Sequence, residues 1–146
     1  RDVAVTGVQT CALPICRASD LAKGYVEKLK IRCDSISKEI RLLSGGNQQK
    51  VVIAKWLSTE PEILIMDEPT AGVDIGTKTE ILEMARNLAN EGKGVLIISS
   101  ELQELLSICD RIVIVKHGTI THEMPRNEIR SEDKLHQILQ GAQASV

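Results

Sequence analysis

The chain has 146 residues, a formal net charge of −2 and 42% hydrophobic residues, which fits one globular unit of ordinary size. It contains no Phe, one Trp and one Tyr, so it lacks the aromatic platforms on which single-stranded nucleic acids stack, and it is not basic. We therefore expect no nucleic-acid partner. No stretch approaches the roughly 20 apolar residues of a membrane span, so any membrane role requires a partner subunit.

Four cysteines, Cys11, Cys16, Cys33 and Cys109, show neither C-x-x-C spacing nor a neighbouring histidine cluster. Such scatter is not typical of a zinc site. We predict reduced, structural thiols and no metal bound by them. No signal peptide pattern precedes them, which favours the cytoplasm.

Residues 1–16 are set apart from the fold. The stretch from Val5 to Ile15 reads, residue for residue, like the in-frame translation of a common short-read sequencing adapter. A natural N-terminal strand is the alternative, since Val, Thr and Ile favour strands, but Pro14 disfavours it. We treat 1–16 as an adapter-derived, non-native and dispensable segment, and we expect the protein's own sequence to enter mid-protein at Arg17.

Apolar residues at helical spacing predict two helices in the first part of the chain. The first runs from Ser19 to Leu29, with Ser19 or Asp20 as cap. The second begins after Ser44 and reaches about Ser58, and Pro61 prevents its extension. Its recurring apolar residues are Val52, Ile53, Trp56 and Leu57.

Strands and helices alternate after Pro61. The apolar run from Ile63 to Met66 predicts a buried parallel strand, and Val95 to Ile98 predicts a second one. Between them, Ile81, Met84, Ala85 and Leu88 indicate an amphipathic helix that ends at the turn 90–92. Strand, helix and strand in this order imply a right-handed crossover.

The last third of the chain predicts a helix over 102–108 and a strand over 112–115. A turn at His117-Gly118 leads into 119–121, which together form a closing hairpin. Ser131 is placed to cap a final helix with Leu135, Ile138 and Leu139 inward. We expect residues 141–146 to be frayed.

Ser44, Gly45 and Gly46 stand immediately before the second helix. Free backbone amides and the helix dipole favour an anion at such a terminus. Two consecutive glycines start helices poorly unless the backbone must approach something closely, which indicates a phosphate. The alternative is an ordinary N-cap by Ser44.

Asp67 and Glu68 end the first predicted strand. The carboxyl ends of parallel strands form the edge where open α/β sheets bind ligands. Two carboxylates there favour metal and water chemistry, as phosphoryl transfer requires. Acidic residues also commonly begin loops, so the pair could instead cap the next turn.

These motifs together resemble a known family. Leu43–Lys50 (LSGGNQQK), the strand ending in Asp67-Glu68-Pro69-Thr70, and Ala71–Asp74 are similar in sequence and spacing to the signature, Walker B and D-loop of ATP-binding-cassette (ABC) ATPases. More narrowly, Gly46–Val52 and Ile97–Leu102 look like the second nucleotide-binding half of the tandem ATPases of bacterial monosaccharide importers of the ribose, xylose and galactose type. The resemblance runs from about Arg17 to Gly141.

The resemblance implies an α/β fold, namely a partial P-loop NTPase (RecA-like) lobe with parallel core strands, a closing hairpin and the end of a helical subdomain. Residues 17–43 would be the end of that subdomain and its connector. Residues 44–123 would hold the signature helix and the Walker B, D-loop and switch lobe. Residues 124–146 would form the C-terminal helix and tail.

The resemblance also assigns roles to individual residues. Asp67 would hold Mg²⁺ through water, Glu68 would orient the attacking water, and Ser100 would stand at the switch position. The resemblance further implies that the signature closes over ATP bound by the partner half. Asp74 is equally explained as the first residue of a helix. The residues implied to contact ATP are Ser44, Gly45, Gly46, Gln48 and Asp74.

Two features depart from the family pattern. Ser100 replaces the usual switch histidine, and a serine donates a hydrogen bond but carries no positive charge. The only Gly-Lys pair, Gly92-Lys93, lacks the other P-loop residues, since Asn87 and Gly94 stand where Gly and Ser or Thr belong. We therefore expect the isolated chain to be inactive. We also expect the site that uses Asp67 and Glu68 to be the weaker of the two ATP sites, because the second half of such importers tends to carry a degenerate P-loop. We assign no role to His117, His122 or His136.

The implied function is that of an ATP-hydrolysing subunit, with ATP and Mg²⁺ as cofactors, that energises sugar import. Its partners would be the first nucleotide-binding half of the same chain, the transmembrane permease and, indirectly, a periplasmic sugar-binding protein. It would lie in the cytoplasm at the inner face of the membrane. The alternatives are a non-catalytic interaction half and a soluble ABC ATPase that serves translation or DNA repair.

Overall fold

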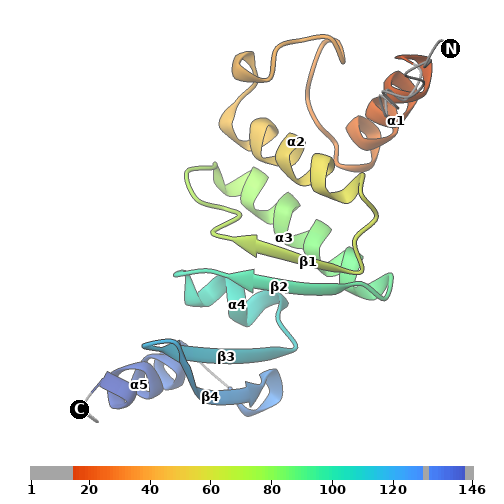
Figure 1. Cartoon of the computed structure of the whole chain (residues 1–146). Helices are drawn as coiled ribbons and strands as arrows, with labels where there is room; N and C mark the ends of the chain where they lie inside the picture. The colour runs from red at the N-terminus through yellow and green to blue at the C-terminus, as the bar shows by residue number, and fades with distance from the viewer. Residues whose placement is uncertain (1–14, 130–131, 144–146) are drawn as a thin grey trace, which may run out of the picture. The chain divides into compact units, whose positions relative to one another are not determined.

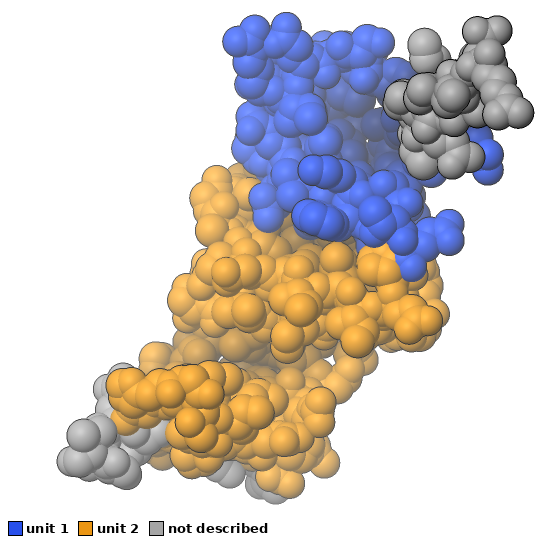
Figure 2. All heavy atoms as spheres, in the orientation of Figure 1, with its two compact units in different colours: residues 1–60 blue, residues 61–146 orange. Residues whose placement is uncertain are grey.

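The structure is a computed structural model that describes residues 15–129 and 132–143 (Figure 1). The chain divides into two compact units, residues 1–60 and residues 61–146 (Figure 2). Residues 1–14 and Ser131, for which we predicted an adapter segment and a helix cap, lie outside the described residues. Within the described part, none of the helices combines the length and apolar character that a bilayer crossing requires.

The first unit contains α1 (Ile15–Lys28), the short η1 (Ile40–Leu42) and α2 (Gly45–Leu57). Both predicted helices are confirmed, although α1 begins before Ser19, inside the segment that we set apart. A Schellman motif ends α1, because Lys30 has a φ of 50° and the Ile31 N–H donates to the Val26 carbonyl at 2.9 Å. The core residues of this unit are Leu29, Ile31, Ile53, Ala54 and Leu57.

The apolar pattern of α2 is wider than its buried stripe. Ile53 and Leu57 are buried, whereas Val52 and Trp56 are 48% and 56% exposed. Residues four apart share a helix face, so Val52 and Trp56 form a separate apolar stripe beside the buried one. The Trp56 ring lies 5.5 Å from the Lys55 ammonium.

The second unit begins with a parallel β-α-β arrangement (Figure 1). Strand β1 (Ile63–Asp67) pairs with β2 (Gly94–Ile98), and Asp67 lies opposite Ile98. Helix α3 (Ile75–Asn90) connects them and contacts β2 and α4 (Leu102–Ile108). The predicted strands, their parallel pairing and both helices are therefore confirmed. Helix α3 buries Ile81, Ala85 and Leu88.

The prediction that both strands are buried is wrong for one of the two faces of the sheet. Leu64 and Met66 are buried, but their neighbours in β1 point to the opposite face and are exposed. Parallel sheets are normally covered on both faces, and within this unit the described elements cover only one face of the sheet. We call the uncovered side the bare face, formed by Ile63 (67% exposed), Ile65 (63%), Leu96 (50%) and Ile98 (50%).

The closing hairpin is confirmed as an antiparallel pair, β3 (Arg111–Lys116) and β4 (Thr119–Pro125). His117 and Gly118 have φ values of 48° and 76°, the positive pair that two-residue hairpin turns favour because it matches the strand twist. Strand β4 is longer than predicted.

The hairpin packs with α4 and α5 (Glu132–Gln143) around one core, which also includes Ile129, the residue after the short η2 (Arg126–Glu128). The predicted inward residue Leu135 is buried, and Ile138 and Leu139 pack against the same core. Fraying was expected over 141–146, but helix α5 continues through Gln143, which contradicts the expectation for 141–143; residues 144–146 lie outside the described residues. The buried residues of this core are Ile112, Ile114, Ile129 and Leu135.

The two described cysteine side chains, Cys33 and Cys109, are free thiols and half-buried. Burial raises the pKa of the Cys109 thiol, which favours its protonated, less nucleophilic form.

Candidate functional site

The signature segment forms the start of α2 in the first unit. Ser44 occupies the N-cap position with extended backbone, but its side chain makes no capping hydrogen bond. Its hydroxyl instead accepts from the Asn47 side-chain amide at 2.8 Å. Gly45 and Gly46 form the first turn, whose amides have no partner within the helix. The ordinary N-cap interpretation of Ser44 is therefore weakened, because its oxygen does not occupy these amides.

Hydrogen bonds made by side chains of α2 fix the backbone that precedes this helix. The Arg32 N–H donates to Asn47 Oδ1, and the Gln48 side-chain amide donates to the Leu43 carbonyl, both at 2.8 Å. The buried Lys50 donates from Nζ to the Lys30 carbonyl at 3.2 Å. Gln48, predicted to contact the nucleotide, thus fixes the loop in this structure.

The second unit brings Glu68 and Ser100 together. Glu68 follows β1 with a φ of 44°, a region that non-glycine residues rarely adopt and that is enriched at functional sites. Its N–H donates to the Ile98 carbonyl at 2.8 Å, which extends the strand pairing by one residue. Its carboxylate Oε1 accepts from the Ser100 N–H at 2.8 Å. The residue therefore holds its side chain against the loop that follows β2.

Asp67, the last residue of β1, presents an exposed carboxylate beside Glu68. Mg²⁺ prefers oxygen ligands and is usually bound by one or two carboxylates, waters and substrate phosphates. Among the described residues, no group of three His, Cys, Asp or Glu side chains is placed to hold a metal alone. The donor set therefore suits Mg²⁺ that arrives with a nucleotide.

Asp74 caps α3. Its carboxylate accepts from the Thr77 N–H at 3.0 Å and from the Thr77 hydroxyl at 2.8 Å. The backbone bond from Thr77, followed by the hydroxyl bond, lowers the pKa of Asp74. Before it, Gly72 has a φ of 70°, which turns the D-loop into the helix. The helix-start interpretation of Asp74 therefore holds, and it is compatible with a D-loop role.

We expect Asp74→Ala to lower the melting temperature of the chain, whereas Asp74→Asn leaves it nearly unchanged, because Asn is an equally good N-cap. The ionised form is favoured in the folded state. Its contribution is therefore present above the unfolded-state pKa and is lost as the pH falls through the depressed folded-state pKa. Thermal melts of the three proteins between neutral and strongly acidic pH measure this. A difference between wild type and Asp74→Ala that grows on acidification would contradict the assignment.

A buried acidic residue was missed by the sequence analysis. Glu104 of α4 is 4% exposed and contacts Thr70, Lys78 and Ser99. Burial acts to raise the pKa of Glu104, but the hydrogen bonds from Thr70, Lys78 and Ser99 outweigh it and lower the pKa. No signal in the sequence marked it, because its helical position lies away from the apolar face formed by Leu102, Leu105 and Leu106.

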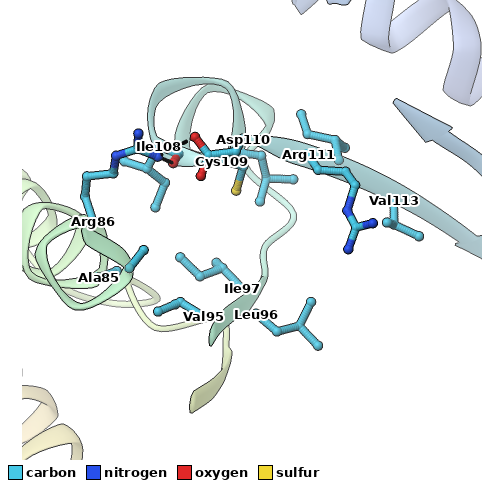
Figure 3. Close-up of a pocket in the computed structure, with 13 residues that line it drawn as sticks. Ala85, Arg86, Val95, Leu96, Ile97, Ile108, Cys109, Asp110, Arg111 and Val113 are labelled. Atoms are coloured by element: carbon cyan, nitrogen blue, oxygen red, sulfur yellow. Dashed lines mark hydrogen bonds and ion pairs between the residues drawn. The ribbon is translucent and has the colours of Figure 1, made fainter. Parts of the chain in front are cut away.

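A cavity of about 310 Å³ lies elsewhere in the second unit, among α3, β2, α4 and β3 (Figure 3). Apolar residues such as Val95 and Ile97 line it, and Arg86 pairs with Asp110 across 2.7 Å at its side. None of the predicted site residues lines this cavity. His117, His122 and His136 are exposed and lie on the hairpin turn, β4 and α5.

The parallel β1-α3-β2 unit, whose first strand ends at Asp67, gives the chain the P-loop NTPase fold of ATP-binding cassettes. Solved structures agree. One ATP-binding cassette, MJ0796, solved as a post-hydrolysis dimer with ADP and Pi, superposes with a TM-score of 0.70 at 25% identity over 79% of this chain and 50% of that one. A second, MJ1267 in its ADP conformation, gives 0.69 at 29% identity over 84% and 49%.

Residues 15–71 match the family model described as "ABC transporter". The L-arabinose transport ATP-binding protein AraG of Geobacillus stearothermophilus is 50% identical over 108 residues, which are 74% of this chain and 21% of that protein. The ribose import protein RbsA 1 of Rubrobacter xylanophilus is 46% identical over 86% of this chain and 25% of its own length. The D-allose import protein AlsA of Escherichia coli is 45% identical over 78% and 22%. The chain thus spans about a quarter of the curated relatives it matches and about half of each solved cassette.

Proposed function

We propose that the chain is the C-terminal part of the second nucleotide-binding half of an ATPase that drives monosaccharide import. One observation carries the proposal: the Glu68 carboxylate is held against the Ser100 N–H at the carboxyl end of a parallel strand, directly after Asp67. This edge is where open α/β sheets bind ligands. The names of the relatives, which are arabinose, ribose and allose transport proteins, support the sugar-import assignment.

In this function, each residue does one task of phosphoryl transfer. Mg²⁺ held by Asp67 through water would neutralise charge on the phosphates. Glu68 orients the attacking water, and its fixed rotamer keeps the carboxylate ready for that contact. The first-turn amides at Gly45 and Gly46 donate to phosphate oxygens, aided by the helix dipole.

The signature serves ATP held by the first nucleotide-binding half, since the P-loop it faces belongs to that half in the family. Asp74 contributes to the seam between the halves while it caps α3. The assembly binds the permease at the cytoplasmic face of the membrane, and a periplasmic sugar-binding protein delivers the sugar.

A non-catalytic half is the second candidate, because Ser100 has no positive charge to place against a γ-phosphate. A soluble ABC ATPase is less well supported, since the relatives above are named for import or transport.

A chimera tests the proposed function. The aligned segment of the E. coli D-allose protein, 45% identical over 114 residues, is replaced by the corresponding part of this chain. We expect the purified chimera, assembled with its own permease, to retain ATP turnover and allose uptake, because the sugar is selected outside this segment. The unchanged parent is the control. A chimera that assembles but neither hydrolyses ATP nor imports allose would contradict the function.

A further inference from the structure

A buried polar cluster connects four segments of the second unit. Glu104 of α4 accepts at Oε1 from the Thr70 hydroxyl at 2.7 Å and pairs there with Lys78 Nζ at 3.0 Å. Its Oε2 accepts from the Ser99 hydroxyl at 2.8 Å. Thr70 follows Walker B, Lys78 lies on α3 and Ser99 follows β2. Both carboxylate oxygens are therefore engaged, each by a different part of the unit.

Ser99 transmits this anchoring to the next residue. While its hydroxyl donates to Glu104, it accepts from the Glu101 N–H at 3.0 Å. The backbone is thereby fixed on both sides of Ser100. The Ser100 N–H then points at Glu68 Oε1, 2.8 Å away. A continuous path of contacts runs from Glu104 through Ser99 and Ser100 to Glu68.

Stability alone is a weak reason for a buried carboxylate at this place. Its desolvation offsets much of the attraction to Lys78, and apolar replacements of buried ion pairs are often neutral or stabilising. Lys78 is also bound by Glu101 at 2.6 Å. The contribution of Glu104 is therefore geometric: its carboxylate orients the Ser99 hydroxyl.

We propose that Glu104 is a positioning residue that sets the orientation of Glu68 through Ser99 and the Ser100 N–H. The effect of this positioning on catalysis rests on the proposed function, whereas the hydrogen bonds from Glu104 to Glu68 form within the chain without a nucleotide. Glu104→Gln changes little volume and removes the charge. With its carbonyl toward Thr70 and Lys78, the new amide faces Ser99 as a donor. The Ser99 hydroxyl then loses its acceptor, and its oxygen must accept from this amide as well as from the Glu101 N–H, which weakens its hold on the backbone around Ser100.

Amide hydrogen exchange of the 146-residue chain, followed by NMR, tests the path. In Glu104→Gln and in Ser99→Ala we expect the Ser100 amide to exchange about tenfold faster, the size of one hydrogen bond to a charged group. The Glu68 amide should keep its rate, because it donates to the Ile98 carbonyl and not to this path. The double variant should exchange no faster at Ser100 than Ser99→Ala alone, since both changes break one path.

Thr70→Val is the matched control, since it removes another hydroxyl from Glu104 but leaves Ser99 in place. We expect it to leave Ser100 exchange unchanged. The inference is overturned if Ser100 exchange is unaffected by Glu104→Gln and Ser99→Ala, or if Thr70→Val accelerates it equally. Parallel acceleration at Glu68 would also overturn it, because that result indicates general loosening.

In the chimera described above, Glu104→Gln should lower kcat for ATP and leave KM unchanged, because Glu104 is buried, with 4% of its surface exposed. A raised KM with unchanged kcat would speak against positioning of Glu68. The exchange measurement decides the path even if the unmodified chimera is inactive, a result that would count against the proposed function alone.

Discussion

We expect Gly45→Asp to abolish ATP turnover in the assembled transporter, whereas Glu68→Gln leaves a substantial fraction of it. Gly45 is the first residue of α2, where the proposed role is to donate backbone N–H groups to phosphate. An aspartate there adds bulk and a negative charge at the place of a developing negative charge. Loss of even one preorganised donor typically costs about 10²–10³ in rate.

Glu68→Gln acts on the other site, the one built on the second half's own P-loop and on Ser100 in place of histidine. That site contributes less to turnover under the proposal. Steady-state ATPase rates of both variants in the chimera measure the difference, with Gly45→Ala as a control that adds a methyl group without charge. If Glu68→Gln is inactive and Gly45→Asp remains active, the proposed division between the two sites is wrong.

Ile81→Ala should lower the free energy of unfolding by about 2–5 kcal/mol, the usual cost of truncating a buried isoleucine. Ile81 is 1% exposed and lies on the buried face of α3, the helix that contacts β2 and α4. Its loss leaves a cavity next to the elements that carry Ser99 and Glu104. Urea unfolding followed by circular dichroism gives the value.

Ile75→Ala is the matched control, since it makes the same substitution in the first turn of the same helix at a side chain that is 83% exposed. We expect a change within about 0.5 kcal/mol. Equal effects at the two positions would mean that α3 does not bury the face assigned to it.

The order and type of the elements could be predicted because they depend on local patterns. Helix α4 matches its predicted bounds, and His117-Gly118 forms the predicted hairpin turn. Burial could not be predicted as well, because periodicity shows where apolar residues recur and not what covers them. Ile65 and Trp56, for example, belong to apolar patterns that predicted burial, but the described residues of their own units do not cover them and both are exposed.

The candidate site shows the same limit. Asp67 and Glu68 were found because they follow a strand in a recognisable order. Glu104 was missed because a single charge in a short amphipathic helix normally faces solvent, and its partners come from three other segments of the chain. Only the tertiary structure brings Thr70, Lys78 and Ser99 to one carboxylate.

The bare face of the β1–β2 sheet affects how the chain unfolds. Four large aliphatic side chains are already hydrated in the folded state, so unfolding exposes less new apolar surface than in a protein of this length with a sheet covered on both faces. Both the denaturant m-value and the heat-capacity change scale with that newly exposed surface. We therefore expect a smaller urea m-value and a smaller heat-capacity change of unfolding than are usual for 146 residues.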